Sequence, residues 1–259
     1  MIEVKDLSFS YYNENVLNGV TFSVEKGALY TVIGLNGAGK STLFGCLAKL
    51  LEVPKGKVFI QQKDITDFSY REYSKVVSYV PQLNAIRTVD CVVRDYMVEG
   101  RTPYLRMFSV PGMHDYEVVE KVAKKIGIER LLGASFSELS GGQQQLVSIA
   151  RALVQDTPII FFDEPMSALD LCNQSMILKL IRELKKEGKT ILFSSHNPNH
   201  AISLGAGIIF LKNGKVMRQE RADSDRLYED IQTVYGDAVI LTECGNRRVV
   251  IFNTEENSE

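Results

Sequence analysis

Residues 34–41 read GLNGAGKS, which fits the phosphate-loop pattern G-x-x-x-x-G-K-[ST] in full. Glycines let backbone N–H groups turn towards phosphate oxygens, and a helix N-terminus adds partial positive charge. Lys40 is expected to reach the β- and γ-phosphates, and Ser41 to bind Mg²⁺. A glycine-rich turn without a ligand is the alternative, but a predicted strand before the loop and a predicted helix after it favour phosphate binding.

Two carboxylates follow the apolar run 159–162 directly, at Asp163 and Glu164. In an open α/β sheet the carboxyl ends of the strands face the ligand. Asp163 is expected to hold Mg²⁺ through water, and Glu164 to polarise the water that attacks the γ-phosphate, a role worth ~10²–10⁴-fold in rate. The alternative is that Asp-Glu-Pro simply opens a loop.

A second helix start that could bind an anion follows Leu139. Ser140 is a suitable N-cap for the helical repeat that begins after Gly141 and Gly142. A glycine-rich cap without a ligand is the favoured interpretation when this segment is considered alone. The spacing of these residues does not indicate what a second phosphate-binding site would do.

The composition limits the possible protein classes. The 259 residues are 45% hydrophobic, with 30 Lys+Arg and 32 Asp+Glu giving a net charge of −2. This excludes a disulfide-rich toxin, a collagen-like rod and a disordered tail. Near-neutral charge argues against a dedicated nucleic-acid binder, so no nucleic-acid partner is expected.

The cysteines and the chain start indicate the cellular compartment. Cys46, Cys91, Cys172 and Cys244 lie far apart, without a CxxC pair or a nearby histidine at metal-ligand spacing. They are expected to be small packing residues in a reducing compartment. The first residues lack a signal-peptide profile, and apolar runs fall short of the ~18 residues that span a bilayer. A cytoplasmic protein, peripheral to a membrane, is therefore expected.

The elements that must position these residues alternate between strand and helix. Strands are predicted at 2–9, 20–24, 28–35, 159–162, 190–193 and 208–211. Helical periodicity is predicted from Leu43 to Leu51, through an insertion at 86–140 with Pro103 and Pro111 in a loop, and from Ile177 to Leu184. This order predicts a parallel sheet with helices on both faces, and a small appendage, one helix and two weak strands, from about 221.

The segment Leu139–Gln143, between the phosphate loop and the Asp163-Glu164 strand, resembles the signature of the ABC transporter ATPases. The resemblance covers nearly all of residues 1–220. It implies an α/β P-loop NTPase with a parallel core sheet, an antiparallel β layer and a helical subdomain at about 86–150. The implied domains are an ATPase domain at 1–220 and a C-terminal appendage at 221–259, and the implied cofactors are ATP and Mg²⁺.

The same resemblance implies a head-to-tail homodimer, in which Ser140 and Gly142 contact the partner's γ-phosphate. Catalytic roles are implied for Glu164, His196 and Gln82, and metal binding for Ser41, Gln82 and Asp163. ATP binding is implied for Tyr11, Asn36, Gly37, Ala38, Gly39, Lys40, Ser41, Thr42, Ser140, Gly141, Gly142, Gln143 and Asp170.

Several of these residues have a plainer interpretation. Gln82 alone would be a loop amide, His196 a surface residue, and the segment 167–170, which the resemblance places across the dimer interface, a helix cap. Tyr11 resembles the aromatic that stacks on adenine, but Tyr12 is an equal rival, and a strand aromatic without a ligand is also open.

A narrower resemblance links Gly100–Leu105 and Phe136–Glu138 to importer ATPases for iron-siderophores, haem or vitamin B12. It implies separate membrane permease subunits, an extracytoplasmic binding protein, and a location on the inner face of the cell membrane. Alternatives are an ABC ATPase of iron–sulfur assembly or the ribosome, and a nucleotide-gated scaffold. Departures from the family pattern, which weaken a ligand assignment, are Gln144, Leu146, Met166, Asn197 and Pro198.

Overall fold

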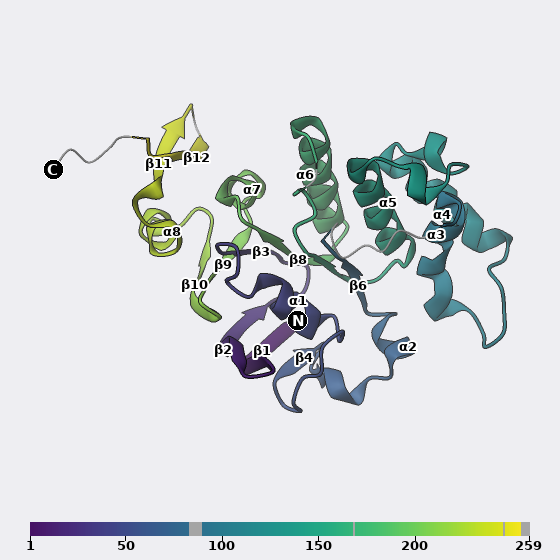
Figure 1. Cartoon of the computed structure of the whole chain (residues 1–259), viewed down its shortest axis with the longest axis horizontal. Helices are drawn as coiled ribbons and strands as arrows, with labels where there is room; N and C mark the ends of the chain where they lie inside the picture. Colours follow the sequence, from purple (N-terminus) through teal and green to yellow (C-terminus); the bar gives the residue numbers. More distant parts are fainter. Residues whose placement is uncertain (83–89, 168, 246, 255–259) are drawn as a thin grey trace.

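A six-stranded sheet forms the centre of the molecule, in the order β10-β9-β3-β8-β7-β6 (Figure 1). The computed structural model describes residues 1–82, 90–167, 169–245 and 247–254. The strands pair in parallel except for β10, which is antiparallel to β9. Their bounds are β3 Leu29–Ile33, β6 Val77–Val80, β7 Ile159–Phe162, β8 Thr190–Ser195, β9 Gly207–Lys212 and β10 Lys215–Arg221. The predicted parallel core sheet is confirmed.

A second sheet is wholly antiparallel, in the order β2-β1-β4-β5. Its strands are β1 Ile2–Tyr11, β2 Glu14–Val24, β4 Val58–Ile60 and β5 Lys63–Asp64. The short helices η1 Ile65–Asp67 and α2 Tyr70–Tyr73 follow it. The predicted antiparallel layer is therefore present, with longer β1 and β2 strands than the sequence indicated.

The strand β7 is buried on both faces, so its side chains join two different cores. Ile159 and Phe161 pack with the antiparallel layer and with α1 (Lys40–Leu47). Ile160 and Phe162 pack with α5 (Gly141–Val154) and α6 (Leu171–Lys186). The sheet thus has helices α5 and α6 on one face, and α1 with the antiparallel layer on the other (Figure 1).

Three helices build the lobe at the edge of the sheet next to β6. These are α3 (Val93–Val98), α4 (Met113–Ile126) and α5, and the 3-10 segments η3 (Glu99–Tyr104), η4 (Glu129–Leu131) and η5 (Phe136–Glu138) connect them. Tyr96 of α3 stacks on Phe136 with 4.4 Å between ring centroids. The predicted helical subdomain is present, and its predicted start at about 86 lies outside the described residues.

The C-terminal segment adds α8 (Leu227–Tyr235), η6 (Gly236–Ala238) and a hairpin of β11 (Val239–Cys244) and β12 (Arg247–Phe252). These are the predicted helix and two strands. They pack on β9 and on α7 (Pro198–Leu204), at the end of the sheet opposite the helical lobe (Figure 1).

The first helix ends earlier than its apolar periodicity predicted. Lys49 is in the left-handed region with φ 59°, and the N–H groups of Leu50 and Leu51 turn back to the carbonyl of Gly45. The two leucines therefore close the helix end instead of extending the helix.

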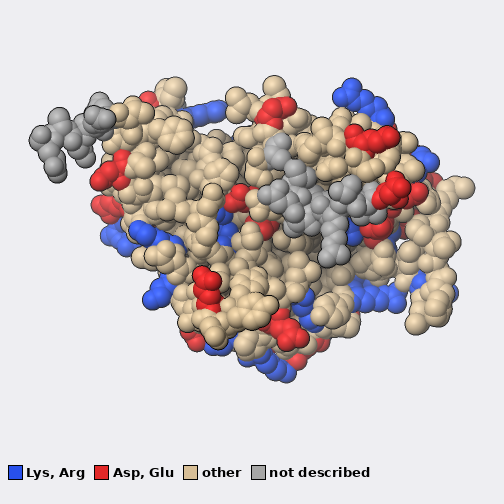
Figure 2. Space-filling view, viewed as in Figure 1, with Lys and Arg blue, Asp and Glu red and all other residues tan. Residues whose placement is uncertain are grey.

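Charged residues of both signs are interspersed over the visible face of the molecule (Figure 2). Across the described ranges, no helix combines the length and apolar character needed to cross a bilayer.

Candidate functional site

The phosphate loop lies between the end of β3 and the start of α1. Gly39 caps the helix with φ 100°, a conformation that glycine adopts at little cost. The loop and the helix start open into a cavity of about 530 Å³. Its walls are formed by Val16, Asn36, Gly37, Gly39, Lys40, Ser41, Thr42, Gln82, Glu164 and His196. The fold therefore brings residues predicted for phosphate binding and for hydrolysis to one place.

Lys40 places its ammonium group over the loop. Its Nζ donates to the carbonyls of Gly34 (2.8 Å) and Leu35 (3.1 Å), and it lies 3.2 Å from Oε1 of Glu164. The residue is 5% exposed. A buried cation at a helix N-terminus is an arrangement suited to a polyphosphate.

Asp163 is buried at the carboxyl end of β7, with 1% exposure. It accepts hydrogen bonds from Ser194 Oγ (2.7 Å) and from Tyr79 Oη (3.4 Å). Burial raises the pKa of Asp163, and hydrogen bonds from Ser194 and Ser41 oppose that shift. Burial also raises the pKa of Tyr79 above its usual value, so this hydroxyl stays protonated.

The hydroxyl of Ser41, which lines the cavity, and the carboxylate of Asp163, which is buried behind the lining residues, are thus neighbours. Mg²⁺ prefers a few hard oxygen ligands together with water and phosphate oxygens. The donor set of these two residues fits that ion, and the Gln82 side chain lines the same cavity.

Glu164 lies between the lysine and the histidine. Its Oε2 is 3.4 Å from Nδ1 of His196, while its Oε1 contacts Lys40. The backbone of Glu164 has φ 46°, which is uncommon for a residue with a side chain, and its N–H donates to Ser194 Oγ (2.8 Å). Strained residues of this kind concentrate at functional sites.

The signature segment lies in a different cavity. Ser140 caps α5 in a capping box with Gln143, and Gly141 begins the helix. Ser140, Gly142, Gln143 and Asp170 line a cavity of about 480 Å³. Within the described residues, this cavity shares no lining residue with the one at the phosphate loop. One chain therefore presents two separate helix starts that are candidates for anion binding.

Asp170, at the end of the segment 167–170, forms the helix cap that the sequence suggested. Asp170 caps α6 by accepting from the N–H of Asn173 at 2.8 Å. Ala168, inside this segment, lies outside the described residues. Whether the segment also contacts a partner stays a prediction.

The two candidate adenine aromatics are at the β1–β2 turn. Tyr11 packs edge-on against Phe9, with ring centroids 5.0 Å apart, and Tyr12 is fully exposed. In the described part of the chain, the cavity wall takes Val16 from this region and neither tyrosine. Ala38, also predicted to bind ATP, is 6% exposed and is not among the lining residues.

Three supports of the site were not predicted from the sequence. Two are Ser194 and Tyr79, whose roles arise only from pairing between strands. The third is the turn Asn213-Gly214, where both residues have positive φ and the N–H of Gly214 donates to the carbonyl of Ala38 (3.1 Å). An Asn-Gly pair between two strands is a recognised hairpin signal and could have identified this turn.

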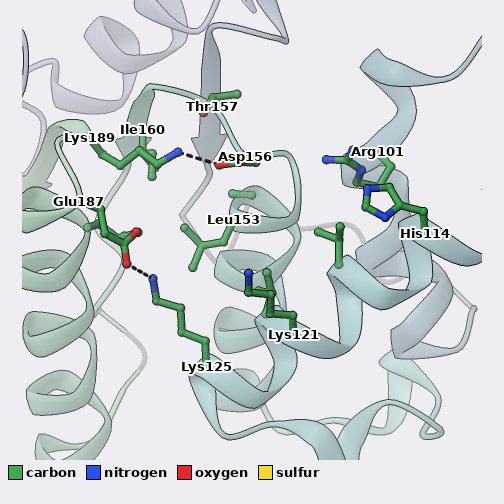
Figure 3. Close-up of a pocket in the computed structure, with 14 residues that line it drawn as sticks. Arg101, His114, Lys121, Lys125, Leu153, Asp156, Thr157, Ile160, Glu187 and Lys189 are labelled. Atoms are coloured by element: carbon green, nitrogen blue, oxygen red, sulfur yellow. Dashed lines mark hydrogen bonds and ion pairs between the residues drawn. The ribbon is translucent and has the colours of Figure 1, made fainter.

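A further cavity of about 390 Å³ separates the helical lobe from the core (Figure 3). Two ion pairs cross its walls, Lys125–Glu187 at 2.6 Å and Lys189–Asp156 at 2.7 Å. Asp156 and Lys189 precede β7 and β8, whereas the phosphate-loop cavity follows the strands. This cavity therefore lies at the amino ends of the strands, and the candidate site lies at their carboxyl ends.

The family profile and the individual relatives indicate the same protein family. The ABC transporter family profile matches residues 17–167, more than half of the chain. A probable iron chelatin transport ATP-binding protein of Helicobacter pylori is 34% identical over 221 residues, 85% of this chain and 86% of that protein. A manganese transport system ATP-binding protein of Listeria monocytogenes is 31% identical, over 94% of this chain and 100% of that protein.

Solved structures agree with the sequence comparison. A protein described as a metal-chelate type ABC transporter, in an inward-facing conformation, has a TM-score of 0.80 at 26% identity and covers 97% of this chain and 96% of its own. A dimeric ABC transporter cassette in a post-hydrolysis state with ADP and Pi has a TM-score of 0.77 at 27% identity, covering 86% and 100%. The α/β P-loop NTPase fold predicted from the sequence is confirmed.

Proposed function

The chain belongs to the ABC transporter family and is an ATPase of the importer type, and from that premise we propose which ligand class, partners and residues it uses. The proposed ligand is an iron-siderophore, haem or cobalamin-type molecule. The similarity to iron chelatin and metal-chelate proteins supports this class. ATP hydrolysis would drive its uptake through separate membrane subunits.

In the proposed mechanism the loop N–H groups and Lys40 bind the β- and γ-phosphates of ATP. Ser41, Asp163 and Gln82 would hold Mg²⁺, which neutralises charge on the phosphate oxygens when it is bound. Glu164 accepts a proton from the attacking water, and its position 3.4 Å from His196 supports a joint role at the γ-phosphate. Burial of Lys40 strengthens its attraction to the phosphates, and burial of Asp163 would strengthen its attraction to Mg²⁺.

We propose an active site that is formed by residues of two subunits. The observation that supports it is that the signature helix start and the phosphate loop line different cavities of one chain. A single chain would leave the Ser140-Gly142 helix start without a phosphate. A head-to-tail homodimer brings this surface of one subunit to the phosphate loop of the other. The solved dimeric cassette supports this assembly.

The proposed permease contact is the surface of η3 beside α2. Arg71 of α2 donates to the carbonyl of Pro103 (3.2 Å) and to that of Leu105, closing one wall of a cavity of about 890 Å³. The following loop exposes Met107 (80%) and Phe108 (95%). An exposed apolar loop that lines a groove of mixed polarity is suited to docking a protein, and this loop projects from the helical lobe (Figure 1).

The complete proposed assembly contains two copies of this chain, two permease subunits and an extracytoplasmic binding protein that delivers the ligand. Docking to the permease would place the ATPase on the inner face of the cell membrane. The Mn²⁺ system among the relatives makes Mn²⁺ a second candidate ligand.

The test is purification of the chain with the permease encoded beside it, followed by ATPase assays in vesicles. The added ligands are a ferric siderophore, haem, cobalamin and Mn²⁺, each with its binding protein. Stimulation by one of the first three supports the proposed class. Stimulation by Mn²⁺ alone would replace it, and failure to form a complex with any permease would favour a non-transport ATPase.

A further inference from the structure

The C-terminal appendage contacts the loop that carries His196. Tyr235, the last residue of α8, donates its hydroxyl to the backbone carbonyl of His196 at 2.7 Å. The His196 side chain in turn lies 3.4 Å from Glu164. A short chain of contacts thus links the appendage to the proposed catalytic carboxylate.

A second contact holds the first turn of α7, three residues after His196. The Asn199 side chain donates to the carbonyl of Val250 (2.9 Å) and accepts from its N–H (2.8 Å). Val250 lies on β12, so both α8 and the hairpin hold the segment 196–199. Paired contacts at both ends of a short segment restrict the peptide orientation between them.

The helix α8 of the appendage packs against the core sheet, which holds these contacts in place. Leu227, Ile231 and Val234 of α8 are at most 2% exposed and pack in one cluster with Ile33 and Phe210. Ile33 ends β3 and directly precedes the phosphate loop. The helix that carries Tyr235 is therefore anchored to the strand that carries the loop.

Tyr235 is suited to act as a permanent donor. Burial raises its pKa above the usual tyrosine value, and the charge of Glu164 adds to that shift. The hydroxyl accordingly stays protonated at neutral pH.

We infer that Tyr235 is a positioning residue for His196, so that the C-terminal appendage holds this histidine in place for the reaction. The inference rests on the proposed role of His196 at the γ-phosphate. A hydrogen bond to the histidine carbonyl fixes the peptide plane and with it the direction of the imidazole. Displacement of a positioned group by about 1 Å can reduce a rate by up to ~10²-fold.

The test compares Tyr235→Phe with Tyr228→Phe. Tyr228 is on the same helix, and its hydroxyl accepts from Gln232 at 2.7 Å, away from the site. We expect Tyr235→Phe to lower kcat for ATP hydrolysis ~3- to 10-fold, the range for one hydrogen bond, with KM and thermal stability close to those of Tyr228→Phe. Equal kcat values for the two variants would overturn the inference.

Two further measurements separate positioning from a general structural effect. The chain has three histidines, so histidine-selective NMR can follow His196 directly. Tyr235→Phe should shift the His196 ring signals and leave those of His114 unchanged. It should also cause no further slowing in a His196→Ala background, assayed by single turnover. An unmoved His196 signal, or equal slowing in both backgrounds, would contradict the inference.

The same experiment distinguishes this inference from the proposed function. If His196→Ala hydrolyses ATP at the normal rate, the proposed role of the histidine fails. The NMR comparison still decides in that case whether Tyr235 orients it.

Discussion

The ammonium group of Lys40 is surrounded by oxygen atoms of the protein. It is held by two loop carbonyls and by Glu164 in the cavity wall. Lys40→Ala removes this cation while its backbone N–H remains at the helix start. We expect ATP affinity to fall about 10- to 160-fold, since a charge-assisted hydrogen bond contributes about 1.5–3 kcal/mol.

Isothermal calorimetry with ATP measures this loss. Lys49→Ala is the matched control, because Lys49 faces the Tyr70 ring and the carbonyl of Phe68. Micromolar ATP affinity in Lys40→Ala would contradict the assignment of the loop.

His200 makes the folded protein sensitive to mild acid. Burial lowers its pKa from 6.5 to about 4, with a contribution from the charge of His196, and its Nδ1 lies 2.9 Å from Ser195 Oγ. Below pH 6.5 the unfolded chain binds a proton that the folded chain excludes until about pH 4. The free energy of unfolding therefore falls across this window, by about 2 kcal/mol at pH 5.

Urea denaturation at pH 7.5 and pH 5 measures the effect. His200→Gln cannot take up this proton, so its stability should fall less between the two pH values than that of the unmodified chain. Identical losses in both proteins would show that His200 does not cause the acid sensitivity.

Residues in contiguous motifs could be predicted from the sequence, and residues brought in by strand pairing could not. Lys40, Asp163 and Glu164 each belong to a motif whose neighbours define its chemistry. Ser194 reaches Asp163 because β8 pairs with β7, and no local pattern encodes that register. Tyr235 is 39 residues from His196 in the chain, so its contact also depends on tertiary packing.

At the scale of elements, continuously apolar strands were predictable, and very short or polar strands were not. The run 159–162 is fully buried, and its composition alone indicates a central strand. The strands β4 and β5 have only three and two residues, and β10 is an edge strand with more charged than apolar residues. Such strands depend on their neighbours for stability, and their sequences contain little periodicity.

The contact between η3 and α5 depends on a glycine. A Cβ at Gly100 would lie 2.4 Å from the carbonyl of Arg151 and 3.2 Å from the N–H nitrogen of Gln155. Gly100→Ala must separate the two elements, so we expect the free energy of unfolding to fall by about 1–3 kcal/mol, as for other overpacked sites.

Gly133→Ala is the control in the same lobe, because among the described residues no heavy atom lies within 4 Å of the added Cβ. Urea denaturation of both variants measures the difference. Equal stability of the two variants would mean that η3 can move away from α5 without cost.

At the scale of the whole molecule, the sequence contains both phosphate-binding motifs but no indication of how far apart they lie. Their separation depends on how the helical lobe is placed against the sheet, which is a tertiary property. Because the two cavities are distinct, each can be changed separately. The homodimer can therefore be tested by blocking hydrolysis at the phosphate-loop cavity and altering the cavity lined by Ser140.

Glu164→Gln preserves the shape of the side chain and removes the proposed base. ATP should still bind, because Lys40 and the loop are unchanged. Hydrolysis should fall at least ~10²-fold, so intact ATP would remain between the phosphate loop of one chain and Ser140 of its partner. Bound nucleotide then stabilises the dimer in proportion to its concentration. Size-exclusion chromatography with light scattering should show a dimer with ATP and a monomer with ADP, which lacks the γ-phosphate.

A second substitution tests where that dimer forms. Ser140→Arg in the Glu164→Gln background should keep ATP affinity, since Ser140 lies outside the phosphate-loop cavity, and should abolish the dimer by placing a bulky side chain at the α5 helix start. A dimer that survives Ser140→Arg would show that the chains associate through another surface. A monomer at saturating ATP in Glu164→Gln alone, or unchanged turnover, would remove Glu164 from its catalytic role.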